Sequence, residues 1–279
     1  MVPPSADALP DVDACFDEAR FLELAGRAHA FTHKWFRFQL RGLERVPDQP
    51  CLFVANHSGA GYADVVCLLG ELGFHFGNRR RVIGLSHSFP LKIPVFGDLI
   101  RSIGAVDASP EAASAAFARG HDVLVYPGGD IDAYRGLHRP RDVVFGTRRG
   151  YARLALEAGV PVVPVATIGS HWSYLVPPGT RLVGRALGLK RRARTEVMPV
   201  TIGMLGVAAA AVWAPWALPI ALVAAIVPNR VRITSEMLPA IDVCAATQEI
   251  TDPAARVEAV HRLVHGALQS AVRDMQHGS

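Results

Sequence analysis

Short apolar runs alternate with amphipathic stretches over the middle of the chain. The clearest run, residues 51–55, lies between Pro50 and the polar sequence Asn56-His57-Ser58-Gly59, which is typical of a buried strand ending in a loop. Similar patterns predict strands at 81–84, 122–126, 160–168 and 231–233, and a strand or turn at 104–106. Helical spacing predicts helices at 15–40, 62–73, 96–103, 111–119 and 150–158.

This alternation predicts an α/β fold with a mostly parallel central sheet flanked by helices. The 279 residues show no internal repeat and no clear linker, so we expect a single domain over 1–279. Residues 1–13 are rich in Pro and Asp and are predicted to form a loose tail. Residues 14–45 are predicted to form an N-terminal helical segment.

Residues 197–229 contain no charged residue. The longest proline-free stretch before Pro215 is 15 residues, or about 22 Å of helix, which is shorter than the roughly 30 Å hydrocarbon core of a bilayer. Trp213 and Trp216 flank the break, and tryptophan favours the membrane interface. Three interpretations remain open: a surface-embedded or re-entrant membrane-docking hairpin, a true span, and a hairpin buried in the core.

Composition adds to the case for membrane contact. Half of the chain is apolar, 19% is charged, and the mean hydropathy of +0.22 is high for a fully soluble enzyme. This composition excludes a disordered protein. The basic cluster 190–194, next to the apolar segment, indicates an anionic cytoplasmic leaflet. The net charge of +4 is too small to indicate nucleic acid, so no nucleic-acid partner is expected.

The N-terminal residues and the cysteines indicate the cellular compartment. The first twenty residues carry five acidic residues and no lysine, which is the wrong charge for a secretory signal peptide. The four cysteines form no CxxC pair, and the chain is too long and cysteine-poor for a disulfide scaffold. We therefore expect a reducing, cytosol-facing location.

The strongest candidate site is His57, placed at the carboxyl end of a predicted strand in a Gly-rich loop. Asp64 follows seven residues later, in the first turn of the next predicted helix. A carboxylate there can accept a hydrogen bond from one ring nitrogen and leave the other as a general base. In the alternative interpretation, His57 caps the helix and Asp64 stabilises its N-terminus.

Other motifs are incomplete. A GxGxxG dinucleotide fingerprint starting at Gly59 has Asp64 in place of its third glycine, and a GxSxG elbow starting at Gly84 has Ser88 at its last position. No Gly-Lys pair of a P-loop occurs. His261 and His265 lack the glutamate of an HExxH motif and are interpreted as a surface pair. We therefore expect no metal ligands and no cofactor.

Four ordered blocks give the chain a family resemblance over about residues 45–235. They are Asn56-His57 with a nearby Asp, Val95-Phe96-Gly97 leading to Gly104, Tyr126-Pro127-Gly128-Gly129, and the run 159–165. Their order and approximate spacing resemble the glycerolipid acyltransferase superfamily. That superfamily includes lysophosphatidate acyltransferases and, with a PGG variant, enzymes like the diacylglycerol acyltransferases.

The resemblance implies a membrane-associated enzyme that moves a fatty acyl group from an acyl thioester to a lipid hydroxyl. The implied partners are an acyl-CoA or acyl carrier protein donor, a lipid acceptor and an anionic membrane surface at the cytoplasmic face of the cell membrane. His57 would be the base and Asp64 its orienting partner. The expected substrate-binding residues are Asn56, Ser58, Tyr126, Gly128, Gly129, Asp130, Arg135 and Arg148.

The sequence departs from the family pattern at two places. The acid after His57 comes two residues later than usual, and the intervening glycines can bulge to compensate. In the FPEGTR block, Gly128 replaces the Glu and Ile131 replaces the Arg that contacts the acceptor phosphate in the family, which argues against a lysophosphatidate-type acceptor. Asp130, Asp132 and Arg135 lie just beyond and would either contact substrate or form a solvated loop.

Two further questions stay open. Arg79, Arg80, Arg81, Arg148 and Arg149 are candidates for binding coenzyme phosphates or lipid headgroups, or are solvated surface charges. The rival functions are a lipid hydrolase or transacylase, and a lipid-binding protein without chemistry.

Backbone N–H groups near Gly128-Gly129 or near 59–61 are expected to form the oxyanion hole.

Overall fold

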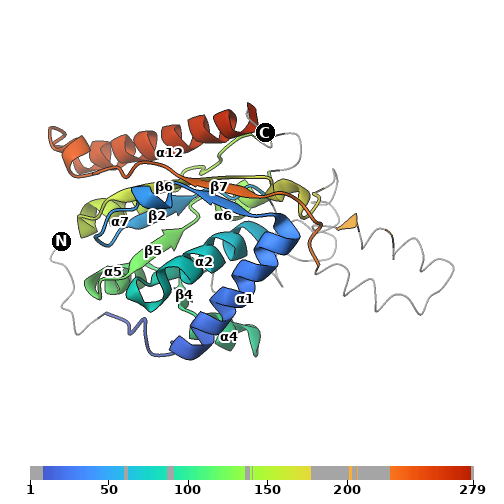
Figure 1. The fold of residues 1–279 in the computed structure, drawn as a ribbon. Coiled ribbons are helices and arrows are strands. Elements are labelled where there is room, and N and C mark those ends of the chain that lie inside the picture. The colour runs from blue at the N-terminus through green and yellow to red at the C-terminus, as the bar shows by residue number, and fades with distance from the viewer. Residues whose placement is uncertain are drawn as a thin grey trace, which may run out of the picture.

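The protein folds around one seven-stranded sheet in the order β1-β7-β6-β2-β5-β3-β4 (Figure 1). The computed structural model describes residues 9–59, 62–86, 91–135, 139, 141–176, 201–202, 206 and 227–277. The strands are β1 Gln39–Arg41, β2 Leu52–Ala55, β3 Val82–Ser86, β4 Ala105–Asp107, β5 Asp122–Val125, β6 Val162–Ile168 and β7 Thr234–Met237. Strands β2 to β6 are mutually parallel, whereas β7 runs antiparallel to β6 and β1 pairs in parallel with β7.

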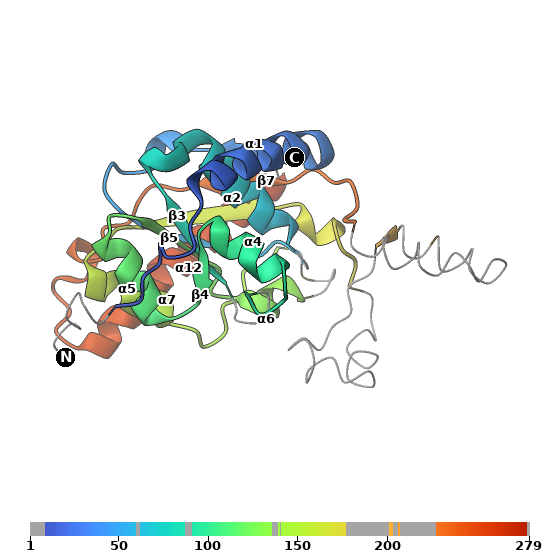
Figure 2. The same ribbon diagram turned by 90° about the horizontal axis from the view of Figure 1, so that it is seen from below.

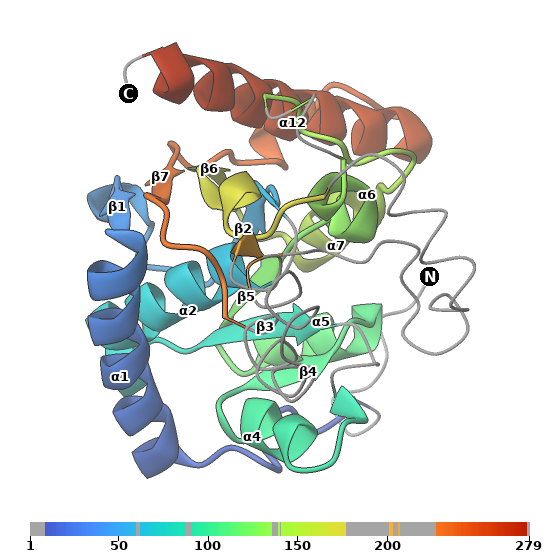
Figure 3. The same cartoon turned by 90° about the vertical axis from the view of Figure 1, so that its right-hand side faces the viewer.

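Helices cover both faces of the sheet. They are α1 Glu18–Phe36, α2 Ala63–Phe76, α4 Phe96–Ser102, α5 Pro110–Ala118, α6 Gly129–Ala133, α7 Gly150–Ala158 and α12 Pro253–His277. Figure 3 shows α1 and α2 on one side of the strands, with α5, α7 and α12 on the other. The predicted α/β fold with a mostly parallel sheet flanked by helices is confirmed.

The central strand β2 shows how the core is divided between the two faces. Its side chains alternate, because successive residues of a strand point to opposite sides. Leu52 and Val54 pack in the cluster that includes α5, α7 and α12, whereas Phe53 packs with Leu68 and Leu72 of α2. All four residues of β2 are buried, as expected for a strand covered on both faces.

Local sequence signals set several helix ends. The Asp17 side chain accepts a hydrogen bond from the backbone N–H of Arg20 at 3.0 Å and caps the start of α1. Ser109 caps α5 in the same way, with Pro110 in the first turn. Gly159, at φ 65°, ends α7 in the left-handed region, where glycine is favoured.

The structure corrects two predicted elements. The helix predicted at 15–40 ends at Phe36, because Arg37 turns to φ 45° and redirects the chain into β1. The strand predicted at 231–233 lies at Thr234–Met237 instead. Strand β7 pairs with β6, and β1 pairs with β7, so these two strands extend the sheet beyond β6.

The N-terminal residues that the structure describes do not form a loose tail. Val12 is buried in the main core cluster, and Asp13 forms ion pairs with Arg81 and Arg119. Residues 1–8 lie outside the described part of the chain. The tail prediction therefore fails at least for residues 12 and 13, whose apolar and acidic side chains both have partners.

Membrane association is not addressed by the described elements. No helix among the described residues has the length and apolar character needed to cross a bilayer. The basic cluster 190–194 and most of the apolar segment 197–229 lie outside the described residues.

Candidate functional site

Three loops meet at the carboxyl edge of the sheet. Strand β2 lies between β5 and β6 and is parallel to both, so the residues after all three strands emerge side by side. These loops carry Asn56–Gly59, Tyr126–Gly129 and Gly169–His171. The carboxyl edge of a parallel sheet is the usual ligand-binding edge of an open α/β fold.

His57 and Asp64 are brought together at this edge. His57 Nδ1 lies 3.2 Å from Asp64 Oδ2, which also accepts the backbone N–H of Ser58 at 3.0 Å. Asp64 Oδ1 accepts the N–H of Val65 at 2.9 Å, and its side chain is 1% exposed. The N-cap residue of α2 is Tyr62, and among the described residues no side chain caps the start of this helix, so His57 is not a helix cap. The geometry is that of a carboxylate orienting an imidazole.

The imidazole of His57 presents its other nitrogen away from Asp64. Its ring stacks on Tyr126, with centroids 4.3 Å apart and planes 19° apart, and its side chain is 13% exposed. Within the part of the chain that the structure describes, Nε2 makes no hydrogen bond. A neutral ring bonded to Asp64 through Nδ1–H has its lone pair on Nε2.

Opposing effects set the charge of His57. Burial lowers the pKa of His57, but the carboxylates of Asp64 and Asp132 raise it by more, and the net pKa lies above the ordinary value of 6.5. The two carboxylates thus strengthen the imidazole as a proton acceptor, which is what a general base requires.

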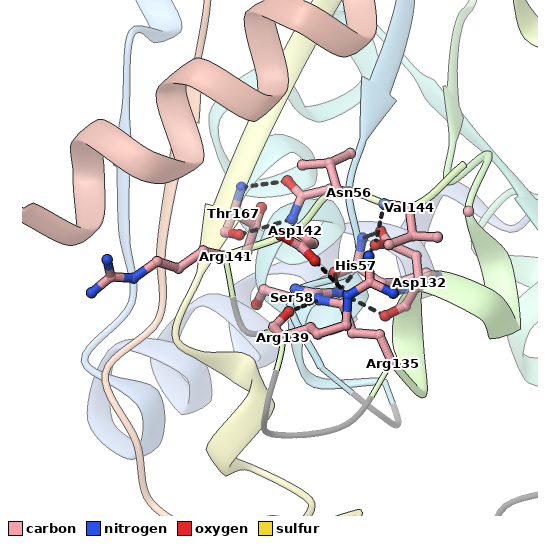
Figure 4. A network of polar contacts seen from close by, with 12 residues as sticks. Asn56, His57, Ser58, Asp132, Arg135, Arg139, Arg141, Asp142, Val144 and Thr167 are labelled. Atoms are coloured by element: carbon pink, nitrogen blue, oxygen red, sulfur yellow. Dashed lines mark hydrogen bonds and ion pairs between the residues drawn. The ribbon is translucent and has the colours of Figure 1, made fainter. Parts of the chain in front are cut away.

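Asp132 and Arg135 hold the backbone of His57 (Figure 4). Asp132 Oδ2 accepts the His57 N–H at 2.7 Å, and Oδ1 accepts the Val144 N–H at 2.9 Å. Arg135 Nη1 donates to the His57 carbonyl at 2.5 Å and to Asp132 Oδ1 at 3.0 Å. Burial raises the pKa of Asp132 to about 6, although Arg135 and both backbone donors favour its ionised form.

These contacts resolve the alternatives for the loop after the PGG turn. Asp132 and Arg135 are buried, so neither belongs to a solvated loop, and the bonds of Arg135 fit a supporting role better than the predicted role in substrate binding. Asp130 is exposed and pairs with Arg148 Nη2 at 2.7 Å. The importance of Asp132 for His57 was missed, because nothing local in the sequence marks a contact between residues 75 positions apart.

Asn56 and Ser58 lie at the site but face inward. The Asn56 amide bonds the backbone of Thr167 in β6 twice, with Nδ2 donating at 3.0 Å and Oδ1 accepting at 2.8 Å. Ser58 Oγ lies 2.5 Å from Ser170 Oγ and accepts the Ser170 N–H at 3.0 Å. Both side chains are buried and fix the loop to β6 and the residues after it, and their role in substrate binding stays a prediction.

The PGG turn is braced by Arg148. Its Nη1 donates to the carbonyls of Pro127 at 3.2 Å and Gly128 at 2.6 Å. A Cβ at Gly128 would lie 2.2 Å from the Asp132 side chain, and one at Gly129, where φ is 48°, would lie 2.5 Å from Arg148. Arg148 and the two glycines thus shape the turn.

The Tyr126 side chain lies directly against His57. Its ring covers one face of His57, and its buried hydroxyl has no hydrogen-bond partner among the residues that the structure describes. Burial, with the nearby Asp64 carboxylate, raises the pKa of Tyr126 well above 10, so the phenol keeps its proton.

The arginines before β3 lie at the wrong edge of the sheet for this site. Arg80 and Arg81 precede β3 and sit at its amino edge, whereas His57 is at the carboxyl edge. Arg80 binds Asp122 through Nε at 2.5 Å and Nη2 at 2.8 Å, and Arg81 pairs with Asp13. Arg80 and Arg81 are thus held in ion pairs away from His57, and a role of 79–81 in binding phosphates stays a prediction. Arg149 pairs with Glu258 at 2.7 Å.

His171 is a site residue that the sequence analysis did not identify. A Cβ at Gly59 would lie 2.4 Å from the backbone of His171, so the two loops pack without space for a side chain. Burial, with a smaller contribution from Arg135, lowers the pKa of His171 to about 4, and its buried Nδ1 has no hydrogen-bond partner in the described part of the chain. The ring is therefore neutral at pH 7.

Comparisons with known proteins match this chain to one family model and to several relatives. The Acyltransferase family model matches residues 37–168. A protein of Bos taurus named "DGAT1/2-independent enzyme synthesizing storage lipids" is 29% identical over 149 residues, covering 53% of this chain and 43% of that protein. The 1-acyl-sn-glycerol-3-phosphate acyltransferase of Pseudomonas aeruginosa is 26% identical over 152 residues, covering 52% of this chain and 56% of the other.

A solved structure extends the likeness to the fold. The crystal structure of the 1-acyl-sn-glycerophosphate (LPA) acyltransferase PlsC from Thermotoga maritima matches with a TM-score of 0.51 and 15% identity, covering 95% of this chain and 85% of that chain. The chain spans about half the length of the curated relatives it matches. The resemblance inferred from the four sequence blocks is confirmed.

Proposed function

We propose that the protein, whose residues 37–168 match the Acyltransferase family model, is an O-acyltransferase. It moves a fatty acyl group from an acyl thioester, of coenzyme A or acyl carrier protein, to a hydroxyl of a membrane lipid. The observation that carries the proposal is the 3.2 Å contact between His57 Nδ1 and Asp64 at the ligand-binding edge of the sheet.

The proposed chemistry needs one proton acceptor. The acceptor hydroxyl attacks the thioester carbonyl carbon while His57 Nε2 takes its proton, and Asp64 stabilises the imidazolium that forms. The tetrahedral intermediate then collapses with cleavage of the C–S bond. The thiolate leaves and takes the proton from His57, so the products are an ester and a free thiol.

The oxyanion of that intermediate needs N–H donors. The Gly129 N–H already donates to the Tyr126 carbonyl at 3.1 Å. Because the Gly129 N–H is already bonded, we favour the loop after His57 as the source of the donors. Residues 60 and 61 of that loop lie outside the described part of the chain.

Exposed apolar side chains surround this edge and support a lipid substrate. Tyr62, Ile131 and Trp172 follow β2, β5 and β6 respectively and are 41%, 43% and 52% exposed. Val95 and Phe96, beyond β3, are 81% and 47% exposed. Apolar groups that gather around a polar site on a folded protein mark a surface for a greasy ligand or a membrane.

Residues in and after the PGG turn favour an acceptor without a phosphate. Ile131 occupies the position of the family's phosphate-contacting Arg, as judged by the resemblance, and the nearby Arg135 and Arg148 bond to backbone carbonyls. The relative named for storage-lipid synthesis agrees with this preference. We therefore favour a neutral lipid alcohol, such as a diacylglycerol.

We also propose that the protein works at the cytoplasmic face of the membrane. The basic residues 190–194, next to the apolar segment 197–229, support this location because the cytoplasmic leaflet is anionic. Flotation with vesicles containing anionic lipid should carry the protein upward, and vesicles of neutral lipid should carry less of it.

The test of function combines one acyl-CoA with a panel of acceptors, read by free-thiol release and mass spectrometry. An acyltransferase releases thiol mainly when acceptor is present and forms the acylated lipid. Thiol release without acceptor would indicate a hydrolase, and ester formation from a lipid donor alone would indicate a transacylase. Acyl-chain binding without His57-dependent turnover would indicate a lipid-binding protein.

A further inference from the structure

Three histidines surround one glutamate where α1 packs on α2. His29 and His33 lie one turn apart on α1, and Glu71 and His75 lie one turn apart on α2. The two helices run side by side in Figures 1 and 2. The proposed acyl transfer uses none of these four residues.

All three rings point a nitrogen at the same carboxylate. Glu71 Oε2 lies 2.8 Å from His29 Nδ1 and 3.0 Å from His33 Nε2, and Glu71 Oε1 lies 3.1 Å from His75 Nε2. The Glu71 side chain is 5% exposed, whereas His33 and His75 are 43% and 42% exposed. The buried carboxylate of Glu71 thus faces three imidazole side chains, all of them partly exposed to solvent.

The spacing fits a transition-metal ion. Within the described part of the chain, His29, His33 and Glu71 are the one group of three such residues whose donor atoms all lie within 4.8 Å of one another. Bonds of about 2.0–2.2 Å in a tetrahedral site place ligand atoms roughly 3.3 Å apart, close to the observed contacts. Imidazole and carboxylate donors suit Zn²⁺, and a pair of histidines at i and i+4 is a common helical source of ligands.

We propose that His29, His33 and Glu71 bind a divalent transition-metal ion, with Zn²⁺ the best match, and that His75 orients Glu71 from the other carboxylate oxygen. Coordination needs the lone pairs of His29 Nδ1 and His33 Nε2, so on binding each neutral ring carries its proton on the opposite nitrogen, and any imidazolium proton is released to solvent. His75 acts as an outer partner that fixes the carboxylate.

The surroundings provide access and orientation. A cavity of about 650 Å³ opens beside the cluster and is lined by residues that include His33 and Glu71, which gives an ion a path from solvent. The Phe74 ring stacks on His29 with centroids 3.8 Å apart and holds that imidazole in place. Three protein ligands leave a fourth position for water on the side of the cavity.

Such an ion would clamp α1 to α2. Glu71 lies seven residues after Asp64, so both carboxylates are on the same face of α2, about 10 Å apart along its axis. The helix that carries the orienting acid of the site would thus be pinned by metal bonds two turns away. The expected role is to stabilise the fold, and no step of acyl transfer passes through the ion.

The test is metal binding by the full-length chain without a histidine tag, after treatment with a chelator. Isothermal titration with Zn²⁺ should show one equivalent bound, and Co²⁺ should give visible absorption bands of a low-coordinate site. Zn²⁺ should also raise the melting temperature, since it binds the folded state, whereas Mg²⁺, which prefers oxygen ligands, should not.

Two variants replace ligands but keep hydrogen bonds to Glu71. His33→Gln places an amide near the Nε2 position and His29→Asn near the Nδ1 position, so each keeps a donor while losing a metal ligand. Each should weaken Zn²⁺ binding by more than the roughly 10–100-fold expected for loss of an outer partner such as His75. The melting temperature of each variant should no longer respond to Zn²⁺.

His265→Gln is the matched control. His265 lies one turn after His261 on α12, and its Nε2 contacts the Val143 carbonyl at 2.9 Å, so this change also keeps a hydrogen bond while removing an imidazole. It should bind Zn²⁺ like the wild type. The proposal is overturned if the wild type binds no Zn²⁺, or if His33→Gln and His29→Asn bind it as tightly as His265→Gln does. Either result would make the cluster a hydrogen-bonded contact between helices.

Discussion

His57 Nδ1 and Asp64 Oδ2 lie 3.2 Å apart across the start of α2. The loop that joins them leaves β2, and its Ser58 N–H binds the same carboxylate oxygen. Asp132, from α6, holds the His57 backbone from the other side. Two carboxylates from separate elements therefore fix one imidazole, the first through its ring and the second through its backbone.

The first prediction concerns the pH dependence of acyl transfer. His57 acts as a base only when neutral, and its pKa is raised above 6.5, so kcat/KM should increase as pH rises through that raised pKa and then level off. Asp64→Asn removes the charge that raises the pKa, while burial still lowers it, so the midpoint should move to lower pH. The plateau rate should also fall, because the ring loses its orienting partner.

The control for that prediction is Asp98→Asn. Asp98 is 82% exposed on α4, where it pairs with Arg101. Its pH profile should match that of the wild type. A wild-type midpoint retained in Asp64→Asn would show that Asp64 does not set the proton affinity of the base.

The second prediction concerns the attachment of the loop to β6. Asn56→Ala leaves the buried N–H and C=O of Thr167 without their side-chain partners, and each such group costs about 1–3 kcal/mol. The free energy of unfolding in urea should fall by about 2–4 kcal/mol. Gln248→Ala, at an exposed position, should stay within about 0.5 kcal/mol. Equal stability of the two variants would mean that the amide contributes little.

The third prediction uses the close packing at Gly59. In Gly59→Ala the new methyl carbon would lie 2.4 Å from the backbone of His171, so one of the two loops must move. Activity should fall well below that of the wild type, since His57 is two residues away. Gly150→Ala adds the same group where nothing lies within 4 Å and should leave activity unchanged. A fully active Gly59→Ala would show that the loop tolerates displacement.

The fourth prediction concerns the second carboxylate. The two oxygens of Asp132 accept one backbone N–H each, from His57 and from Val144. The amide of Asp132→Asn can accept only one of them and presents its NH₂ to the other. We expect a loss of about 1–3 kcal/mol in stability and a lower kcat, since the His57 backbone is displaced. Unchanged kcat with reduced stability would restrict Asp132 to a structural role.

The elements that carry the site could be predicted because their signals are local. The apolar run of β2, the Gly-rich loop after it and the acid at the start of α2 lie within fourteen residues, from 51 to 64. Strands β5 and β6 are also largely apolar, although β5 begins at Asp122 and β6 contains Pro164 and Thr167. The order of these elements, combined with the rule that parallel strands expose their carboxyl ends together, places the candidate residues at one edge.

The rest depends on contacts between distant parts of the chain. Asp132 meets His57 across 75 residues, and Asn56 meets Thr167 across 111. Glu71 meets His29 across 42, so the histidines on α1 did not stand out as possible ligands. The edge strand β1 and its neighbour β7 are only three and four residues long, and their pairing in the sheet, rather than their composition, defines them.

The most direct measurement is the turnover of His57→Ala with an acyl thioester and a lipid alcohol, beside its melting temperature. Among the described residues the His57 side chain makes one hydrogen bond, to Asp64, so the variant should fold. The account predicts kcat lower by about 10²–10⁴-fold, the usual contribution of a general base. A folded variant that retains more than about a tenth of the wild-type rate would contradict the assignment of His57 as that base.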